Sequence, residues 1–380
     1  MVSDEILHRL NDGTSQKVVH VKEEMLPGHQ RLDFYLETII ARSPHLRDAG
    51  AAVQAIAEAG KRIAKLLACG PLAGNLAAIV GDSIDGDGQK ALDVLTHDIV
   101  LDALRAAPVA VFASEEADQP EILNPAAHLA VAVDPLDGSS NVDTLAPVGT
   151  IFSILPITDF DAAAPELVFY QPGRNQLAAG FLIYGPHTAL VLTIGAGTTI
   201  FTLDPASGQF LATINDVTVS PKTREYAING SNMRHWDPEI RSYIVDLKKG
   251  HSGPRGVDFN MRWLASMVAE AYRILQRGGI YLYPVDQRPN YRAGRLRLIY
   301  EANPIAMIME QAGAAATDGH SAILDLCPKT LHQRCALVFG SADEVARVRE
   351  AYAGGDPTPS PLFKSRSLFR QAGSDHELLT

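Results

Sequence analysis

Apolar residues recur every three or four positions over three stretches in the first third of the chain. They do so over residues 29–41, 46–69 and 91–106, and this spacing predicts three helices, each with one apolar side. The second stretch is rich in Ala, Lys and Leu, which are good helix formers. In the third helix, the side predicted to face the core carries Leu92, Leu95, Ile99 and Leu104.

Between about residues 109 and 215 the pattern changes to short runs rich in β-branched residues. Turn residues separate the runs, among them Pro-Gly at 172–173 and Asp-Pro at 204–205. Such a pattern predicts a mainly antiparallel sheet. The predicted strands are residues 109–112, 129–133, 150–155, 177–184, 189–194 and 198–203.

The second half of the chain mixes the two patterns, so it predicts helices that cover a sheet. The predicted helices are residues 237–248, 260–276, 303–312 and 341–353. The predicted strands are residues 226–229, 279–283, 296–300 and 335–339. The fold class is therefore α/β or α+β.

The length of 380 residues suits two domains, each able to bury a core of its own. A turn within residues 215–222 marks the expected boundary. We therefore expect four segments along the chain. They are a polar arm over 1–28, an α+β domain over 29–217, an α/β domain over 218–353 and a flexible tail over 354–380.

Composition narrows the function classes. Hydrophobic residues make up 46% of the chain and charged residues 20%, as in ordinary globular proteins. A net charge of −11 argues against nucleic acid or an anionic membrane as a partner. Three cysteines, no signal peptide and no long apolar span lead us to expect a cytoplasmic protein.

Acidic residues follow two of the predicted strands directly. Glu115 and Glu116 come after the strand at 109–112, and Asp134 comes after the strand at 129–133. Any one such pair can simply be a solvated acidic loop. Carboxylates at the ends of two strands, however, repel one another unless a cation lies between them. Their oxygen atoms suit Mg²⁺ or Mn²⁺.

The loop that begins at Asp134 adds features that suit phosphate chemistry. Pro135 fixes a turn that lets Asp134 and Asp137 face one point, and Gly138 lets backbone N–H groups approach an anion. An acidic, metal-binding loop of this kind suits phosphoryl transfer to water. Phosphate-binding P-loop, dinucleotide, zinc-protease and serine-hydrolase motifs are all missing from the sequence.

Seven blocks follow one another along the chain: residues 86–95, 114–116, 134–141, 148–152, Arg262 with 266–269, 278–284 and 296–304. Taken together, these blocks resemble class I fructose-1,6-bisphosphatase over roughly residues 46–340. The D-P-L-D-G core by itself marks only the wider superfamily of lithium-sensitive sugar and inositol phosphatases. Its D-G-S-S-N extension, a Tyr-Pro block and an L-R-L-x-Y-E-x-N-P block narrow the resemblance from that superfamily to the class I fructose-1,6-bisphosphatases.

The resemblance implies a layered α-β-α-β-α sandwich, a homotetramer and a metal-dependent enzyme of gluconeogenesis or the Calvin cycle. The enzyme would hydrolyse the 1-phosphate of fructose-1,6-bisphosphate with two or more Mg²⁺ ions per subunit, or with Mn²⁺. Asp93 and Glu116 would polarise the attacking water, with Asp87 nearby. The metal ligands would be Glu115, Glu116, Asp134, the Leu136 carbonyl, Asp137 and Glu301.

The resemblance also implies a substrate site. Gly138, Ser139 and Arg297 would bind the phosphate that is hydrolysed. Met267 would line the sugar. The other phosphate would be held by Asn229, Tyr283, Arg295 and, from a neighbouring subunit, Arg262.

Some positions depart from the family pattern. Trp263 stands where a phosphate-binding Tyr is common, and Arg295 replaces the usual Lys. The stretch 229–232 also differs. Residues 46–50 and 128–129 do not match the family's AMP site, so we do not expect AMP inhibition of the usual kind.

Other functions stay open at this level. Sedoheptulose-1,7-bisphosphatase activity, alone or in addition, is the near alternative. An inositol-phosphate or nucleotide-bisphosphate phosphatase is disfavoured by the basic residues Arg262 and Arg295. A non-catalytic sugar-phosphate-binding protein would need a broken metal site, whereas every expected acid is present.

Overall fold

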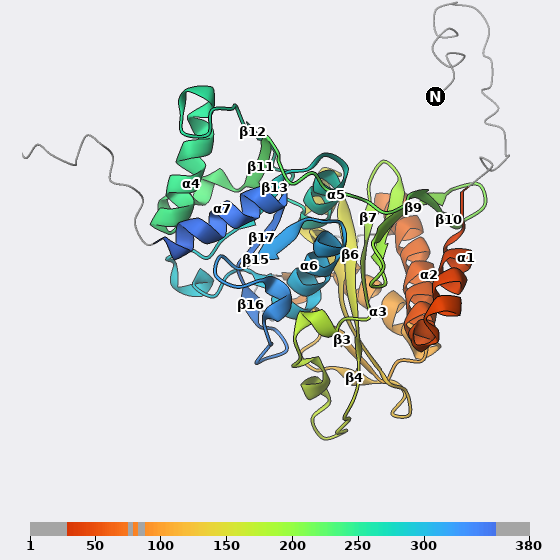
Figure 1. Cartoon of the computed structure of the whole chain (residues 1–380). Coiled ribbons are helices and arrows are strands. Elements are labelled where there is room, and N and C mark those ends of the chain that lie inside the picture. Colours follow the sequence, from red (N-terminus) through yellow and green to blue (C-terminus); the bar gives the residue numbers. More distant parts are fainter. Residues whose placement is uncertain (1–28, 75–78, 83–87, 355–380) are drawn as a thin grey trace, which may run out of the picture.

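The computed structural model describes residues 29–74, 79–82 and 88–354. The predicted N-terminal arm, nearly all of the predicted tail and Asp87 lie outside these residues. The chain forms five layers in the order helices, sheet, helices, sheet, helices (Figure 1). This arrangement confirms the α-β-α-β-α sandwich expected from the sequence.

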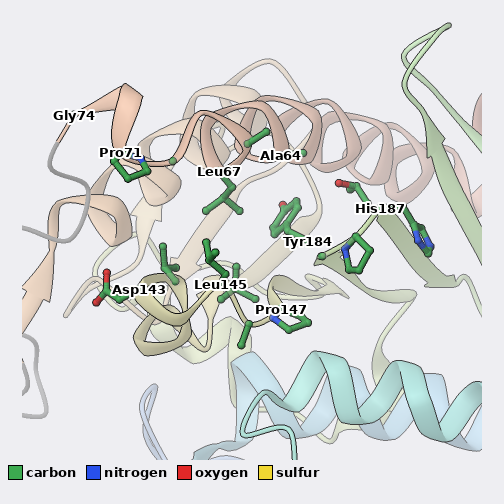
Figure 2. A pocket seen from close by; sticks show the side chains of 17 residues that line it. Ala64, Leu67, Pro71, Gly74, Asp143, Leu145, Pro147, Tyr184 and His187 are labelled. Carbon is green, nitrogen blue, oxygen red and sulfur yellow. The ribbon is translucent and has the colours of Figure 1, made fainter. Parts of the chain in front are cut away.

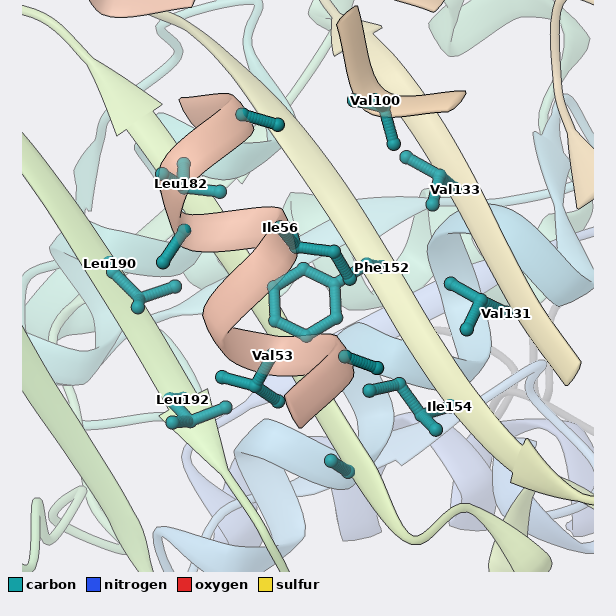
Figure 3. Close-up of a cluster of buried hydrophobic side chains, with 14 of the residues drawn as sticks. Val53, Ile56, Val100, Val131, Val133, Phe152, Ile154, Leu182, Leu190 and Leu192 are labelled. Atoms are coloured by element: carbon teal, nitrogen blue, oxygen red, sulfur yellow. The ribbon is translucent and has the colours of Figure 1, made fainter. Parts of the chain in front are cut away.

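The first helix layer covers one face of an eight-stranded sheet. It consists of α1 (Leu32–Arg42), α2 (Arg47–Cys69) and α3 (Ala91–Arg105), as the helical spacing predicted. Val53 and Ile56 of α2 pack onto the ring of Phe152 in the middle of that face (Figure 3). Each of these three side chains is almost fully buried, so the helix layer is held mainly by apolar contact.

The eight-stranded sheet has the order β10-β9-β8-β7-β6-β5-β3-β4. Its neighbours pair antiparallel, except for the parallel pair β3–β5, which confirms the predicted sheet type. The sequence pattern missed β4 and β10. The strands are β3 (Val111–Ser114), β4 (Glu121–Ile122), β5 (Leu129–Asp137), β6 (Val148–Pro156), β7 (Ala178–Tyr184), β8 (Thr188–Thr193), β9 (Thr198–Asp204) and β10 (Gln209–Ile214).

Two helices fill the middle layer between the sheets. They are α5 (Met267–Arg277) and α6 (Asn303–Gln311), and both are buried against side chains of the two sheets. In Figure 1 they lie between the yellow strand β6 and the blue strands β15 and β17. The middle layer therefore connects the N-terminal and C-terminal halves of the chain through one continuous apolar core.

The second sheet has five strands in the order β12-β11-β13-β17-β15. Its outer face is covered by α4 (Pro238–Lys248) and α7 (Ala342–Ala353). Two small two-stranded sheets, β1–β2 and β14–β16, complete the fold. The remaining strands are β1 (Ile79–Asp82), β2 (Gly88–Lys90), β11 (Glu225–Ile228), β12 (Asn260–Met261), β13 (Ile280–Tyr283), β14 (Leu296–Arg297), β15 (Ala315–Thr317), β16 (Arg334–Cys335) and β17 (Leu337–Gly340).

Three local predictions were wrong. The predicted strand 296–300 ends after Arg297 and continues as a π-helical turn, Leu298–Ala302, because a fully buried apolar run fits either structure. The predicted helix 260–276 begins only at Met267, since Ala265 has a left-handed backbone (φ 55°). Leu95, predicted to face the core, is 41% exposed.

No helix in the described part of the chain is long and apolar enough to cross a membrane. The division of the chain into domains at residues 217 and 218 stays a prediction.

Candidate active site

Strand pairing brings the first acids of the site together. β3 and β5 run parallel, with Ser114 beside Val133, so the residues that follow, Glu115 and Asp134, emerge at the same edge of the sheet. The N–H of Glu115 donates to the carbonyl of Val133 at 3.0 Å and keeps the two chains in register to this point. This is the arrangement that the sequence pattern predicted for two acidic strand ends.

A third acid arrives from the other half of the chain. Glu301 lies in the π-helical turn before α6, and that turn contacts β5 and β6. One carboxylate oxygen from each of Glu115, Asp134 and Glu301 lies within 4.8 Å of the other two. A single ion could contact all three at this spacing, and the donors are oxygen atoms only, which suits Mg²⁺ or Mn²⁺.

Burial makes this acidic cluster unfavourable without a cation. Asp134, Asp137 and Glu301 are 5%, 9% and 6% exposed. Burial, and then the charge of Glu115, raises the pKa of both Asp134 and Glu301 well above the ordinary value. Burial also raises the pKa of Asp137 to about 6. The residues present therefore fit a divalent metal ion, which would supply the missing positive charge.

The loop after Asp134 turns its backbone toward the cluster. Asp134 Oδ1 accepts a hydrogen bond from the N–H of Leu136 at 3.0 Å, and the pairing of β5 with β6 becomes irregular between Asp134 and Asp137. The Thr150 hydroxyl donates to the carbonyl of Pro135 at 2.8 Å. An irregularity of this kind re-aims side chains at a strand end, and here it places both aspartates on a buried site.

Asp137 is held by the start of α5. The N–H of Val268 donates to Asp137 Oδ2 at 3.1 Å, and Ser266 caps the helix by accepting from the N–H of Ala269 at 3.4 Å. A helix N-terminus stabilises a negative charge placed against it. Because α5 also begins with Met267, the residue expected to line the sugar, this helix start connects the acidic cluster to the predicted substrate site.

Gly138 and Ser139 begin the expected phosphate loop. Gly138 has a φ of 76°, and the short 3₁₀ helix Ser139–Thr144 follows it. The Asn141 side chain donates to the carbonyl of Ala265 at 2.8 Å, which joins this loop to the segment before α5. The N–H of Asn141 donates to the carbonyl of Gly138 and closes the turn.

Arg297 places a buried positive charge among the acids. Its side chain is 5% exposed, and its Nε lies 3.5 Å from Glu115 Oε1. Its backbone N–H donates to the carboxylate of Glu301. The predicted phosphate-binding arginine is therefore brought next to the acidic cluster.

The two residues expected to act on water lie on neighbouring elements. Asp93 is buried in the first turn of α3, and α3 packs against β3 and β5. Glu116 follows Glu115, and its charge contributes to the raised pKa of Asp134. The third residue, Asp87, lies outside the described residues.

The predicted distal-phosphate residues gather at one end of the second sheet. β11 and β13 run parallel with Ile228 beside Leu282, so Asn229 and Tyr283 come at the same edge. The Trp263 ring stacks on Tyr281 and Tyr283, with centroids 5.9 Å and 6.1 Å away. The pKa of Tyr281 is raised by burial and, in part, by the charges of Asp137 and Glu301, so this aromatic stack lies near the acidic cluster.

Arginine side chains line the same region. The Arg295 guanidinium carbon lies 3.6 Å from the ring centroid of Tyr291 and 5.8 Å from that of Tyr283. Sequence reasoning missed Arg288, which forms an ion pair with Asp286 and donates to Asn232 Oδ1 at 3.1 Å. The sequence feature that could have indicated Arg288 is the high density of arginines between residues 288 and 297.

Arg262 lies at the edge of this region. Its side chain is 51% exposed, and its Nε lies 3.5 Å from Glu225 Oε1 of the same chain. The Arg262 side chain is thus paired with Glu225 and remains half-exposed.

A separate cavity of about 1210 Å³ lies apart from the acidic cluster. Figure 2 shows it between Leu67 near the end of α2, the turn at Leu145 and Pro147, and His187 of the β7–β8 hairpin. Its lining is mainly apolar and includes none of the acids described above. This cavity is therefore not the place where the predicted chemistry would occur.

Comparison with known proteins gives a consistent result. Residues 38–215 match the family model "Fructose-1-6-bisphosphatase, N-terminal domain", and residues 219–353 match "Fructose-1-6-bisphosphatase, C-terminal domain". The fructose-1,6-bisphosphatase class 1 of Acidiphilium cryptum is 62% identical over 348 residues, which cover 92% of this chain and 98% of that protein. The protein of the same name from Methylobacterium radiotolerans is 51% identical over 341 residues, covering 88% and 97%.

Solved structures agree with these sequence relatives. The holo form of Leishmania major fructose-1,6-bisphosphatase has a TM-score of 0.80 at 34% identity and covers 86% of this chain and 100% of that one. The apo form has a TM-score of 0.75 at 32% identity with the same coverage.

Proposed function

The chain belongs to the fructose-1,6-bisphosphatase family, and we propose on this basis that it hydrolyses the 1-phosphate of fructose-1,6-bisphosphate. Water is consumed, and fructose 6-phosphate and inorganic phosphate are released. The observation that carries the proposal is the acidic group of Glu115 with the buried Asp134 and Glu301, which lies next to Arg297.

The proposed cofactor is Mg²⁺, two or more ions per subunit, with Mn²⁺ as the alternative. Its ligands would be Glu115, Glu116, Asp134, the Leu136 carbonyl, Asp137 and Glu301. When bound, the metal would supply a Lewis acid for the phosphoryl oxygens and lower the pKa of bound water.

Residues of the chain itself would accept the proton and bind the phosphoryl group. Asp93 and Glu116 would accept the proton that the attacking water loses. The backbone N–H groups of Gly138 and Ser139, together with the Arg297 guanidinium, would hold the phosphoryl oxygens and stabilise the charge that develops on them. The buried position of Arg297 supports this role, because a cation is worth more where water is excluded.

The second phosphate would bind at the far end of the site. Asn229, Tyr283 and Arg295 would hold it, and Met267 would line the sugar between the two phosphates. We further propose a homotetramer in which Arg262 of the partner subunit completes this end. The half-exposed end of Arg262 supports its availability to a neighbour.

The sedoheptulose alternative gains no support, because the relatives reported above are named for the fructose substrate. The relatives' names also support a place in carbohydrate metabolism.

The test is release of phosphate from fructose-1,6-bisphosphate with and without Mg²⁺. We expect release with Mg²⁺ and a loss of at least about 100-fold with excess chelator, because the charge on the phosphoryl group would lack its cation. We expect a similar loss in Asp137→Ala, because the ion would lose a ligand. Asp102→Ala, which removes an exposed carboxylate on α3, should keep the wild-type rate. Equal release in chelator, or an undiminished rate in Asp137→Ala, would overturn the proposal.

A further inference from the structure

Residues 262–266, here called the bridging loop, connect β12 to α5 and touch several parts of the predicted site. Trp263 stacks on Tyr281 and Tyr283. The carbonyl of Ala265 accepts a hydrogen bond from Asn141 in the phosphate loop. A displacement of the bridging loop would therefore reach both ends of the substrate site.

The backbone of the bridging loop needs external support. Ala265 has a φ of 55°, a left-handed conformation that is unfavourable for a residue with a Cβ atom. Leu264, next to it, is 46% exposed, so burial of its own side chain does not fix the backbone at this point. Polar contacts from α5 and β11 supply the support instead.

The support begins at a buried carboxylate. Glu270 in α5 is 0% exposed, and its Oε1 accepts a hydrogen bond from the N–H of Leu264 at 2.7 Å. Its Oε2 accepts from Arg273 Nε at 3.0 Å. One carboxylate thus joins the bridging loop to an arginine three residues further along the same helix.

The chain of charges then returns to the loop. Arg273 Nη1 donates to Glu225 Oε2 at 2.7 Å, and Glu225 Oε1 lies 3.5 Å from Nε of Arg262. The charges alternate through Glu270, Arg273, Glu225 and Arg262, and the first three side chains are 0%, 11% and 18% exposed. The bridging loop is therefore held at Leu264 through its backbone and at Arg262 through its side chain.

Such a network contributes geometry more than stability. Buried ion pairs lose hydration that their attraction only partly returns, so apolar side chains of similar size would stabilise a fold equally well. What apolar side chains could not do is accept the Leu264 N–H and direct the Arg262 guanidinium. Fixed geometry of this kind is what a binding site for a charged group requires.

We propose that Glu270, Arg273 and Glu225 form a positioning network that holds the bridging loop and thereby sets affinity for the second phosphate of a sugar bisphosphate. This proposal rests on the proposed function. The three residues touch neither the reacting phosphate nor the acidic cluster in the described contacts; they act through Arg262 and Trp263.

The main test is Glu270→Gln, which keeps the shape and one acceptor oxygen but removes the charge that pairs with Arg273. We expect KM for fructose-1,6-bisphosphate to rise about tenfold and kcat to stay within threefold. For fructose 1-phosphate, which lacks the second phosphate, kcat/KM should change less than twofold. An equal loss on both substrates, or an unchanged KM for the bisphosphate, would overturn the proposal.

Binding without turnover gives a second readout. Fructose 6-phosphate retains the second phosphate, so its dissociation constant in Glu270→Gln should rise about tenfold. Inhibition by inorganic phosphate should not change, because phosphate alone can bind at the metal end. The reverse pattern would mean that the network serves the acidic cluster instead.

The matched control is Glu344→Gln. Glu344 is also a buried carboxylate, 5% exposed on its side chain, and it pairs with Arg255 and accepts from the Tyr243 hydroxyl at 2.7 Å. We expect both Glu344→Gln and Glu270→Gln to lower the melting temperature. Glu344→Gln, however, should leave KM unchanged for fructose-1,6-bisphosphate and for fructose 1-phosphate. A tenfold rise in KM here would show that any buried charge loss has the same effect, and the proposal would fall.

If Glu270→Gln does not fold, Arg273→Lys tests the same network. It keeps the positive charge but loses the planar fork that joins Glu270 to Glu225. We expect an intermediate rise of about threefold in KM for the bisphosphate with an unchanged rate on fructose 1-phosphate. If wild-type protein releases no phosphate from either substrate, the proposed function fails; if only the variants' KM values stay unchanged, the positioning network alone fails.

Discussion

Gly138 turns the backbone directly after the two aspartates of the D-P-L-D-G run. Its φ of 76° lies in the left-handed region, and a Cβ atom there would meet Asn141 Nδ2 at 3.2 Å. The same Asn141 amide reaches Ala265 in the bridging loop. A single residue type is therefore required both for the backbone conformation and for the room beside the phosphate loop.

Gly138→Ala should lower both stability and activity. The left-handed backbone should cost about 1–2 kcal/mol, and the displaced Asn141 should reduce kcat at least tenfold. The matched control is Gly208→Ala in the β9–β10 turn, where φ is 65° and no atom lies within 4 Å of the new Cβ. Melting curves should show similar losses for the two variants, whereas phosphate-release assays should show a loss only for Gly138→Ala.

The acidic cluster should make the metal-free protein sensitive to pH. Burial raises the pKa of Asp137 to about 6 in the folded chain, above its unfolded value, so the folded state binds the proton more tightly. The corresponding stability is present below about pH 4 and is lost as pH rises through about 6. In chelator, the melting temperature of Asp137→Asn minus that of wild type should therefore increase as pH rises over this range.

Added Mg²⁺ should reverse the order. Wild type would gain stability at pH 7–8 by binding the ion, and Asp137→Asn would gain less. A melting temperature of metal-free wild type that rises relative to Asp137→Asn between pH 4 and 7 would contradict this account.

At the scale of elements, α3 shows how buried polar residues shift the buried side of a helix. Its buried positions include Leu92, Thr96 and Val100, which lie four residues apart, and Asp93 beside them. The Thr96 hydroxyl donates to the carbonyl of Asp93 at 3.0 Å. A prediction that counts only apolar residues places Leu95 inside, whereas the structure gives that place to Asp93 and Thr96.

Leu92→Ala and Leu95→Ala form a matched pair on this helix. Leu92 is 0% exposed, so its truncation should cost about 2–5 kcal/mol. Leu95 is 41% exposed, and its truncation should cost less than about 1 kcal/mol. Thermal unfolding at fixed Mg²⁺ measures both, and equal losses would show that Leu95 packs against something that the described residues do not include.

At the scale of the molecule, the five layers explain why residues far apart in sequence share one site. Glu115 and Asp134 end strands of the first sheet, while Glu301 enters from the turn before α6 in the middle layer. Tyr281 and Tyr283 come from the second sheet. The middle layer is therefore the part of the fold that places the acidic cluster next to the aromatic stack.

The proposed tetramer can be tested by mixing two variant subunits with different defects. Asp137→Ala should abolish the metal end of its own site, and Arg262→Ala should raise KM about tenfold. If Arg262 acts in the neighbouring site, hybrids of the two variants should contain sites with wild-type KM, because the Asp137→Ala subunit supplies its intact Arg262. Hybrids that keep only the high KM would show that Arg262 serves its own subunit, and sedimentation would report the assembly directly.

Local sequence was enough to predict a large part of this protein. The helical and β-branched periods predicted α1 to α4, α6, α7 and the sheet strands from β5 to β9, because each has a side or face that must be buried. The acids that follow β3 and β5 were predicted to share a cation, because carboxylates at two strand ends otherwise repel one another. The parallel pairing that brings them to one edge is seen only in the structure. Their oxygen donors alone favoured Mg²⁺ or Mn²⁺ as the expected metal.

Only the tertiary structure decided which distant residues join this framework. Nothing local in Glu301 or Arg297 shows that they lie against Glu115; their approach depends on the packing of the middle layer. The contact of Glu270 with Leu264 depends likewise on the turn at Ala265. The spacing of apolar residues along the sequence indicates which face of a helix or strand is buried. Which residues it meets across the interface depends on how the layers pack.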